Sequence, residues 1–255
     1  MTSAPKDKEL KPWEAYIPQN HWRNATDEAE GAKLGMWLFL STEVLLFAGF
    51  FCAYAFFRML YPENWHEASR YYLDWEIGAA NTAVLLLSSF TIVLAIRAAQ
   101  QGNRGMMLIQ LGITQLCAAF FLVVKLGWEY WPKIRDGKLP GVFFDYPAVY
   151  AQRAAEKAMI TGSDAVIPAA QVAGDYASTF TPGAHDHIFL SIYWISTATH
   201  GFHVLVGMFV IGWAMWKAYK WHYGPRHYTS LENVGLYWHI VDIIWIFLFP
   251  LLYLV

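Results

Sequence analysis

Two pairs of polar residues stand out because they interrupt long apolar stretches of the sequence. His239 and Asp242 lie near the start of the last stretch, which runs to Val255, and His200 and His203 lie in the stretch before it. The members of each pair are three residues apart, so on a helix they share one face. Imidazole and carboxylate groups inside a membrane either exchange protons, bind a cofactor or bond to a neighbouring helix.

Metal or haem binding is the more specific interpretation of the two histidines. Histidines at this spacing seldom give both axial bonds to one haem, because those bonds come from opposite sides of the ring. They could bind a metal only with a third group, which His239 or Asp242 would supply. We prefer hydrogen bonding between the two last spans, in which His200 or His203 contacts Asp242 or Glu129, because it explains the residues without a cofactor.

A third candidate is Glu43, which lies about a third of the way into the first apolar stretch. One interpretation is a carboxyl group bonded to a neighbouring helix. The other is a site that exchanges protons or contacts lipid, since carboxylates within a membrane are candidates for function by default. Lys125 and Glu129, four residues apart, are predicted to pair near the outer interface.

The composition indicates a protein that crosses a membrane several times. Of 255 residues, 56% are hydrophobic and only 15% are charged, which is too apolar for a soluble domain of this length. The 13 tryptophans suit positions at membrane interfaces. A net charge of -2 argues against nucleic acid as a partner. Cys52 and Cys117 lie in apolar stretches without metal-binding spacing, so we expect them to act as small apolar residues.

Apolar stretches of spanning length predict an all-α membrane protein with five transmembrane helices in one bundle. We expect spans at about 34–60, 77–98, 106–131 and 188–216, and a fifth of about 20 residues that ends the chain. Residues 1–33 read as a surface tail, and residues 34–255 as the transmembrane domain. The polar residues of the second span suit contacts between helices; they are Asn81, Thr82, Ser88, Ser89 and Thr91.

The segments between the spans give weaker signals. Residues 133–186 form a long extramembrane insertion with one plausible short helix at 148–160, and residues 62–72 read as a polar turn. Thr26 or Asp27 is the expected N-cap of a helix. Gly201 and Gly207 are expected to permit close approach of helices.

The distribution of lysine and arginine predicts the orientation of the chain. The N-terminal tail and the short loops after the second and fourth spans carry more basic residues than the opposite side. The positive-inside rule therefore places the N-terminus in the cytoplasm, and the insertion and the C-terminus outside. In a bacterium this membrane would be the inner, cytoplasmic one.

Five segments of the sequence, in this order, resemble subunit III of the haem–copper terminal oxidases, which include cytochrome c oxidase and quinol oxidase. They are STEVLLFAGFF at 41–51, NTAVLL at 81–86, WEY at 128–130, HGFHV at 200–204 and YWHIVDIIW at 237–245, which Phe247 and Leu248 follow. The longest family members have seven spans, and this chain matches the last five. The tail and the long insertion lie outside the resemblance.

The resemblance implies an accessory subunit without a redox centre of its own. Haem and copper would belong to the catalytic subunit I, and subunit II or a cytochrome c-type subunit would be a further partner. Bound phospholipid and support of proton uptake are implied as well. By matching position, Glu43 is the family's buried carboxyl near lipid and subunit I, and His203, His239 and Asp242 are polar positions inside the bundle.

Other functions remain open at this point. Quinol oxidases and nitric oxide reductases have related accessory subunits that share these segments. A small proton-coupled transporter could use Glu43, His200, His203 and Asp242 as a relay, although no repeat or broken helix of the kind that transporters show is visible. A b-type cytochrome would bind haem through its histidines, and an optical spectrum would reveal it.

Overall fold

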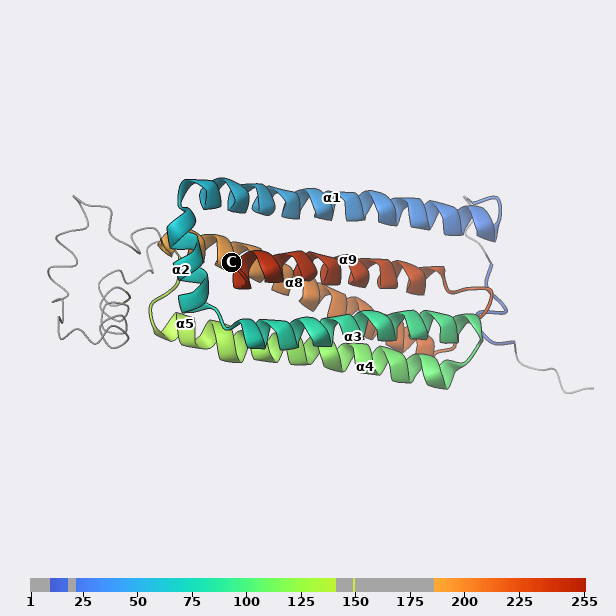
Figure 1. Cartoon of the computed structure of the whole chain (residues 1–255). Helices are drawn as coiled ribbons and strands as arrows, with labels where there is room; N and C mark the ends of the chain where they lie inside the picture. Colours follow the sequence, from blue (N-terminus) through green and yellow to red (C-terminus); the bar gives the residue numbers. More distant parts are fainter. Residues whose placement is uncertain (1–9, 18–21, 141–148, 150–185) are drawn as a thin grey trace, which may run out of the picture. The chain divides into compact units, whose positions relative to one another are not determined.

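The computed structural model describes residues 10–17, 22–140, 149 and 186–255, and within these residues it is helical without strands. Figure 1 shows the helices in chain order. They are α1 (Ala25–Leu60), α2 (Pro62–Tyr72), α3 (Trp75–Gln100), α4 (Arg104–Val124), the π-helix η1 (Lys125–Tyr130), α5 (Trp131–Arg135), α8 (Asp186–Tyr219) and α9 (Thr229–Tyr253).

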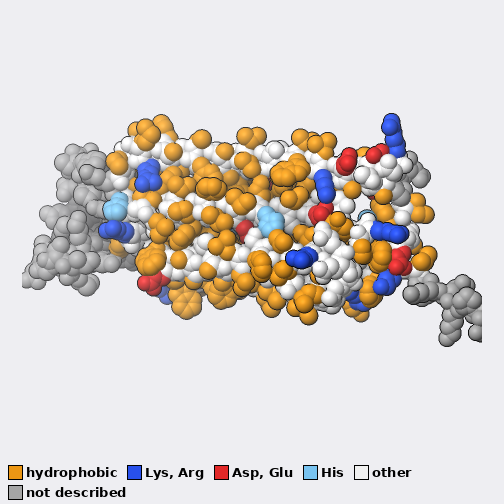
Figure 2. All heavy atoms as spheres, turned by 45° about the vertical axis from the view of Figure 1, so that its right-hand side comes forward, with side chains coloured by type: hydrophobic (Ala, Val, Ile, Leu, Met, Phe, Trp, Pro, Cys, Tyr) orange, Lys and Arg blue, Asp and Glu red, His pale blue; other side chains and the backbone are white. Residues whose placement is uncertain are grey.

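Five helical segments are long and apolar enough to cross a membrane, which confirms the predicted number of spans. They are α1, α3, α8, α9 and the continuous run Arg104–Arg135, which contains α4, η1 and α5. Figure 2 shows hydrophobic side chains over most of the visible surface between sparse charged groups. An apolar exterior of this kind is suited to lipid or to other membrane subunits.

The first helix begins earlier than the hydropathy pattern predicts. α1 starts at Ala25, inside the segment assigned to the surface tail. The hydropathy pattern does not reveal this start, because the first turns of the helix are polar. Asn24 caps it: the Asp27 backbone N–H donates to Asn24 Oδ1 at 2.8 Å. The predicted cap at Thr26 or Asp27 is therefore wrong, and the chain uses the neighbouring asparagine for the same purpose.

The predicted polar turn at residues 62–72 is also wrong, because this segment is helix α2. Pro62 occupies the first turn, where its missing N–H costs nothing. Trp65 and Ala68 are buried on one side of the helix, and Ser69 Oγ donates to the Leu252 carbonyl at 2.7 Å. A short amphipathic helix is mostly polar in sequence, so hydropathy alone does not separate it from a turn.

The third span contains a change of helix type that the sequence analysis did not predict. After Val124 the α-helical pattern widens into the π-helix η1, and α5 then carries the span to Arg135, past Pro132. The remainder of the predicted insertion, including the predicted helix at 148–160, lies outside the described residues apart from 133–140 and Val149.

The chain divides into two compact units that share the long helices. The first unit comprises Met1–Val44, Val84–Ala119 and His203–Ile243, and the second comprises Leu45–Ala83, Phe120–Phe202 and Ile244–Val255. Each unit has its own buried residues and its own polar cluster, and the clusters are described separately below.

Small and hydroxyl-bearing residues hold the helices of the first unit together. Thr91 of α3 and Thr114 of α4 share a hydrogen bond of 2.8 Å between their hydroxyl groups. Gly207 of α8 packs on Trp238 of α9, since an added Cβ would lie 2.7 Å from the indole ring. This contact confirms the prediction for Gly207. The same prediction for Gly201 is wrong, because a Cβ there would meet no atom within 4 Å.

Aromatic rings fill the core of the second unit. Trp65 of α2 is only 1% exposed and packs edge-on against Tyr54 of α1 and Phe189 of α8, with ring centroids 5.5 and 5.3 Å apart. Trp245 of α9 donates its indole N–H to Thr82 Oγ1 of α3 at 3.0 Å. The Trp245 contact combines apolar burial with a hydrogen-bonded indole N–H, which fixes α9 against α3 within this unit.

Candidate functional site

The structure pairs Glu43 with His203, for which the sequence analysis had predicted Asp242 or Glu129 as the partner. Glu43 Oε2 of α1 lies 2.8 Å from His203 Nε2 of α8. The side chains are 15% and 13% exposed, so the pair is neither sealed off nor open to bulk solvent. Tyr237 of α9 donates its hydroxyl to the His203 carbonyl at 3.1 Å and so ties a third helix to the pair.

This geometry gives the Glu43–His203 pair a defined chemistry. The hydrogen bond forms whether the proton lies on the carboxyl oxygen or on the imidazole, and with one shared proton the pair carries no net charge. A neutral pair costs far less in an apolar setting than either ion alone. Both side chains keep part of their surface exposed, which a fully buried pair would not.

His239 and Asp242 of α9 meet α3 rather than α8. His239 Nδ1 and Ser89 Oγ are 2.6 Å apart, and the Trp238 indole N–H donates to Ser88 Oγ at 3.0 Å. The Asp242 carboxyl is 2% exposed and lies beside the Ser88 and Ser89 hydroxyl groups, but neither of its oxygens has a hydrogen-bond partner within the described residues.

These contacts bear on the predicted roles of the polar residues of the second span. The hydroxyl groups of Thr82, Ser88, Ser89 and Thr91 all bond to neighbouring helices, as predicted. Asn81 is 2% exposed, and its side-chain oxygen has no hydrogen-bond partner within the described residues. Its predicted interhelical bond through that oxygen is therefore not found.

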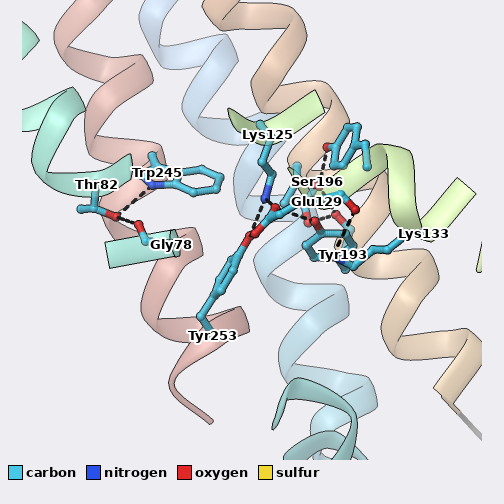
Figure 3. Close-up of polar contacts among 11 residues, drawn as sticks. Gly78, Thr82, Lys125, Glu129, Lys133, Tyr193, Ser196, Trp245 and Tyr253 are labelled. Atoms are coloured by element: carbon cyan, nitrogen blue, oxygen red, sulfur yellow. Dashed lines mark hydrogen bonds and ion pairs between the residues drawn. The ribbon is translucent and has the colours of Figure 1, made fainter. Parts of the chain in front are cut away.

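The second unit holds a buried ionic cluster around the π-helix. Lys125 and Glu129 form the predicted ion pair, and each side chain is 3% exposed. Tyr193 of α8 donates to Glu129 Oε2 at 2.9 Å, and the Tyr253 hydroxyl at the end of α9 lies 2.6 Å from Glu129 Oε1. Figure 3 shows Lys125, Tyr193 and Tyr253 converging on the Glu129 carboxylate.

Aromatic rings surround the ammonium group of this cluster. Lys125 Nζ lies 4.9 Å from the Trp245 ring centroid and 5.0 Å from that of Tyr193, distances at which ring faces attract a cation. Lys133 adds a second positive charge, and its Nζ donates to the Glu129 carbonyl at 3.4 Å. Removing one partner of such a buried, hydrogen-bonded charge pair is strongly destabilising. The cluster is therefore expected to hold η1, α8 and α9 together.

His200 lies in the second unit among aromatic rings. It is fully buried, stacks on Trp245 with centroids 5.1 Å apart, and meets Phe121 edge-on at 5.7 Å. Glu129, one of its two predicted partners, bonds instead to Lys125, Tyr193 and Tyr253. Among the residues that the structure describes, no group of three or more His, Cys, Asp or Glu side chains is arranged to hold a metal.

Several residues of these clusters were missed at the sequence level. Tyr193, Tyr237 and Tyr253 read as ordinary interface aromatics, and their hydroxyl groups gave no sign of a specific acceptor. Lys133 was assigned to the insertion but is 7% exposed in the structure. The one usable signal was Lys125 with Glu129, because their spacing along the chain already places them together.

The described part of the N-terminal segment packs on the loop between α8 and α9. The Tyr16 ring stacks on His227 with centroids 3.9 Å apart, and its hydroxyl donates to Glu28 Oε1 at 2.7 Å. Partial burial and the Glu28 carboxylate raise the pKa of Tyr16 to about 12. Burial, followed by the positive charge of Lys217, lowers the pKa of His227.

Comparison with known proteins places this chain in a family. The family model described as "Cytochrome c oxidase subunit III" matches residues 14–145 and 148–255. Curated relatives named cytochrome c oxidase subunit 3 include the protein of Mammuthus primigenius, 30% identical over 88% of this chain and 69% of its own length. The protein of Pisaster ochraceus is 28% identical over 92% of this chain and 78% of its own length. This chain therefore belongs to the cytochrome c oxidase subunit III family.

Proposed function

We propose that this chain is a non-catalytic accessory subunit of cytochrome c oxidase, a membrane complex in which other subunits carry out the chemistry. The names of the relatives favour this function over a quinol oxidase, a nitric oxide reductase or a transporter. The finer proposals are that it packs on the haem–copper catalytic subunit I and neighbours subunit II or a cytochrome c-type subunit. It would stabilise the catalytic subunit and its lipids.

The observation that carries this proposal is the uncovered first helix. In the most apolar 18-residue window of α1 only 11% of the residues are buried, against 33–50% in the other four spans. Trp37, Leu38 and Leu45 are 58%, 64% and 72% exposed. A helix that leaves this much apolar surface uncovered is suited to pack on another membrane subunit or on tightly held lipid.

A groove beside the Glu43–His203 pair supports the proposal that this chain holds phospholipid. It encloses about 330 Å³ and is lined mainly by apolar side chains of α1, α8 and α9, among them Phe39, Val210 and Tyr237. Lys217 Nζ lies 3.9 Å from the ring centroid of Trp213, which also lines the groove. An acyl chain would occupy the apolar groove, and the ammonium group would attract its phosphate.

We propose that the chain itself binds no haem, copper or other metal. Two of the candidate ligands bond to other side chains: His203 to Glu43 and His239 to Ser89. The redox cofactors would lie in the catalytic subunit. The orientation is proposed from the basic residues: the N-terminus and the loops around Arg104 and Arg226 face the cytoplasm of a bacterial inner membrane, and the C-terminus and the 133–186 insertion face outward.

Purification from native membranes in mild detergent, through a tag on this chain, tests the proposed assembly. We expect a large haem–copper subunit to co-purify, together with oxygen-reducing activity that depends on cytochrome c. Recovery of the chain without such a subunit would contradict the proposal. Activity with quinol in place of cytochrome c, or reduction of nitric oxide in place of oxygen, would assign the chain to the corresponding complex instead.

A further inference from the structure

A tryptophan with an unusual backbone conformation lies where α8 ends. Trp221 has φ of +60°, the only positive value at a non-glycine residue within the described chain. Its N–H donates to the Ala218 carbonyl, and the His222 N–H donates to the Lys217 carbonyl at 3.1 Å. This is the helix-ending motif that normally takes glycine, and a side chain at that position costs about 1–2 kcal/mol.

Two cations lie against the indole of Trp221. Lys11 Nζ is 4.4 Å from the ring centroid and the Arg104 guanidinium carbon is 4.8 Å from it. Arg104 also lies over the ring of Tyr219, at 4.7 Å. Within the described residues neither cation forms an ion pair with a carboxylate, and Arg104 Nε is buried without a hydrogen-bond partner.

The same residues border an open groove. It encloses about 650 Å³ between the turn that joins α3 to α4 and the end of α8, and it is lined by residues 101–105, Leu108 and Trp221. Its walls combine the guanidinium group of Arg104 and polar groups of Gln101 and Asn103 with the apolar surface of Leu108 and the indole. The groove lies at the ends of spans, the level at which tryptophan and basic residues meet lipid headgroups.

We propose that this groove binds the phosphate group of an anionic phospholipid such as phosphatidylglycerol. Arg104 would bond to the phosphate, and its contacts with two aromatic rings hold the guanidinium group in place. Two positive charges beside one ring repel each other, and a bound anion would offset that repulsion. Leu108 and the indole would cover the beginning of the acyl chains.

This site differs from the Phe39–Tyr237 groove of the proposed function. It is built from α3, α4 and the end of α8, and no residue lines both grooves. The occupant of one can therefore be lost while the other stays filled. The inference does not depend on which catalytic subunit the chain assembles with.

The test is a titration of the purified full-length chain, in detergent, with phosphatidylglycerol, phosphatidylcholine or inorganic phosphate, followed by native mass spectrometry. We expect Arg104→Gln to weaken one phosphatidylglycerol-binding event about tenfold, the loss expected for one charged hydrogen bond. Arg97→Gln removes the same charge from the exposed end of α3 and should leave this event unchanged. Lys217→Gln should affect a different event, at the other groove.

Trp221→Gly gives a second variant that does not depend on the charge. Glycine tolerates the positive φ, so the chain should keep its melting temperature while the same binding event weakens. Equal binding of phosphatidylcholine, or equal loss in the Arg97 and Arg104 variants, would overturn the proposal. Saturation by inorganic phosphate with no further effect of phosphatidylglycerol would overturn the lipid assignment.

Discussion

The two units treat buried charge in opposite ways. In the first unit Glu43 meets a single imidazole, and both side chains keep 13–15% of their surface exposed. In the second unit Glu129 accepts from Lys125, Tyr193 and Tyr253, and its side chain is 3% exposed. The buried cluster is suited to holding helices together, whereas the partly exposed Glu43–His203 pair keeps some access from outside the protein.

The largest effect is expected from breaking the buried cluster. Glu129→Leu leaves the ammonium groups of Lys125 and Lys133 without their carboxylate, and we expect a loss of about 3–5 kcal/mol in the free energy of unfolding. Denaturant titration in detergent, followed by tryptophan fluorescence, measures it. The double variant Lys125→Met/Glu129→Leu should recover most of the loss. If Glu129→Leu were as stable as the parent chain, the cluster would not be what holds these helices together.

The next effect compares two glycines of the same helix, one in each unit. Gly207→Ala forces a Cβ to within 2.7 Å of the Trp238 ring, and such overpacking costs about 1–3 kcal/mol. Gly201→Ala places the same group in open space and should be neutral or slightly stabilising. Melting temperatures of the two variants decide this, and equal shifts would mean that α8 and α9 are not in close contact at Gly207.

Breaking the Glu43–His203 pair is expected to change stability less, but to change lipid retention and catalytic lifetime. Glu43→Ala removes one hydrogen bond, about 1 kcal/mol, and should leave the chain folded. We expect less phospholipid to be retained during purification and a shorter catalytic lifetime of the assembled oxidase. Glu43→Gln, which keeps the bond to His203, is the matched control. Unchanged lipid content and lifetime in both would reduce Glu43 to a structural residue.

The smallest effect concerns acidification at the loop between α8 and α9, where Tyr16 stacks on His227. Because the pKa of His227 is lowered by burial, the folded state binds its proton more weakly than the unfolded state does. The docked N-terminal segment should therefore be held fully above about pH 6.5, the ordinary histidine value, and loosen as the pH falls below it. Hydrogen exchange of residues 10–17 measures this, and His227→Phe should remove the pH dependence.

Local spacing and hydropathy are enough to predict the spans and one ion pair of this protein. The five spans follow from apolar runs of membrane-crossing length, and the Lys125–Glu129 pair follows from its separation of four residues. α2 was missed because polar residues dominate its sequence, so the burial of Trp65 leaves no apolar run to detect. The N-cap of α1 was expected at Thr26 or Asp27, whereas Asn24 caps the helix.

The partners of the intramembrane polar groups could not be derived in the same way. His203 and Glu43 are far apart in the sequence, and the sequence analysis named Asp242 or Glu129, not Glu43, as the partner of His203. The tyrosines that complete the Glu129 cluster come from α8 and α9 and carry no local signal. The change to a π-helix at Lys125 was likewise not signalled by apolar periodicity.

The central proposal is that Glu43, His203, His239 and Glu129 serve as bonding partners for neighbouring side chains and that the chain holds no cofactor. The most direct test is an optical spectrum, with metal analysis by mass spectrometry, of this chain after it has been separated from its complex and refolded in lipid. The account predicts no haem absorption band and no stoichiometric metal, while the oxidase from the same membranes shows both. A haem band or a bound metal that disappears with His200→Phe or His203→Phe would contradict it.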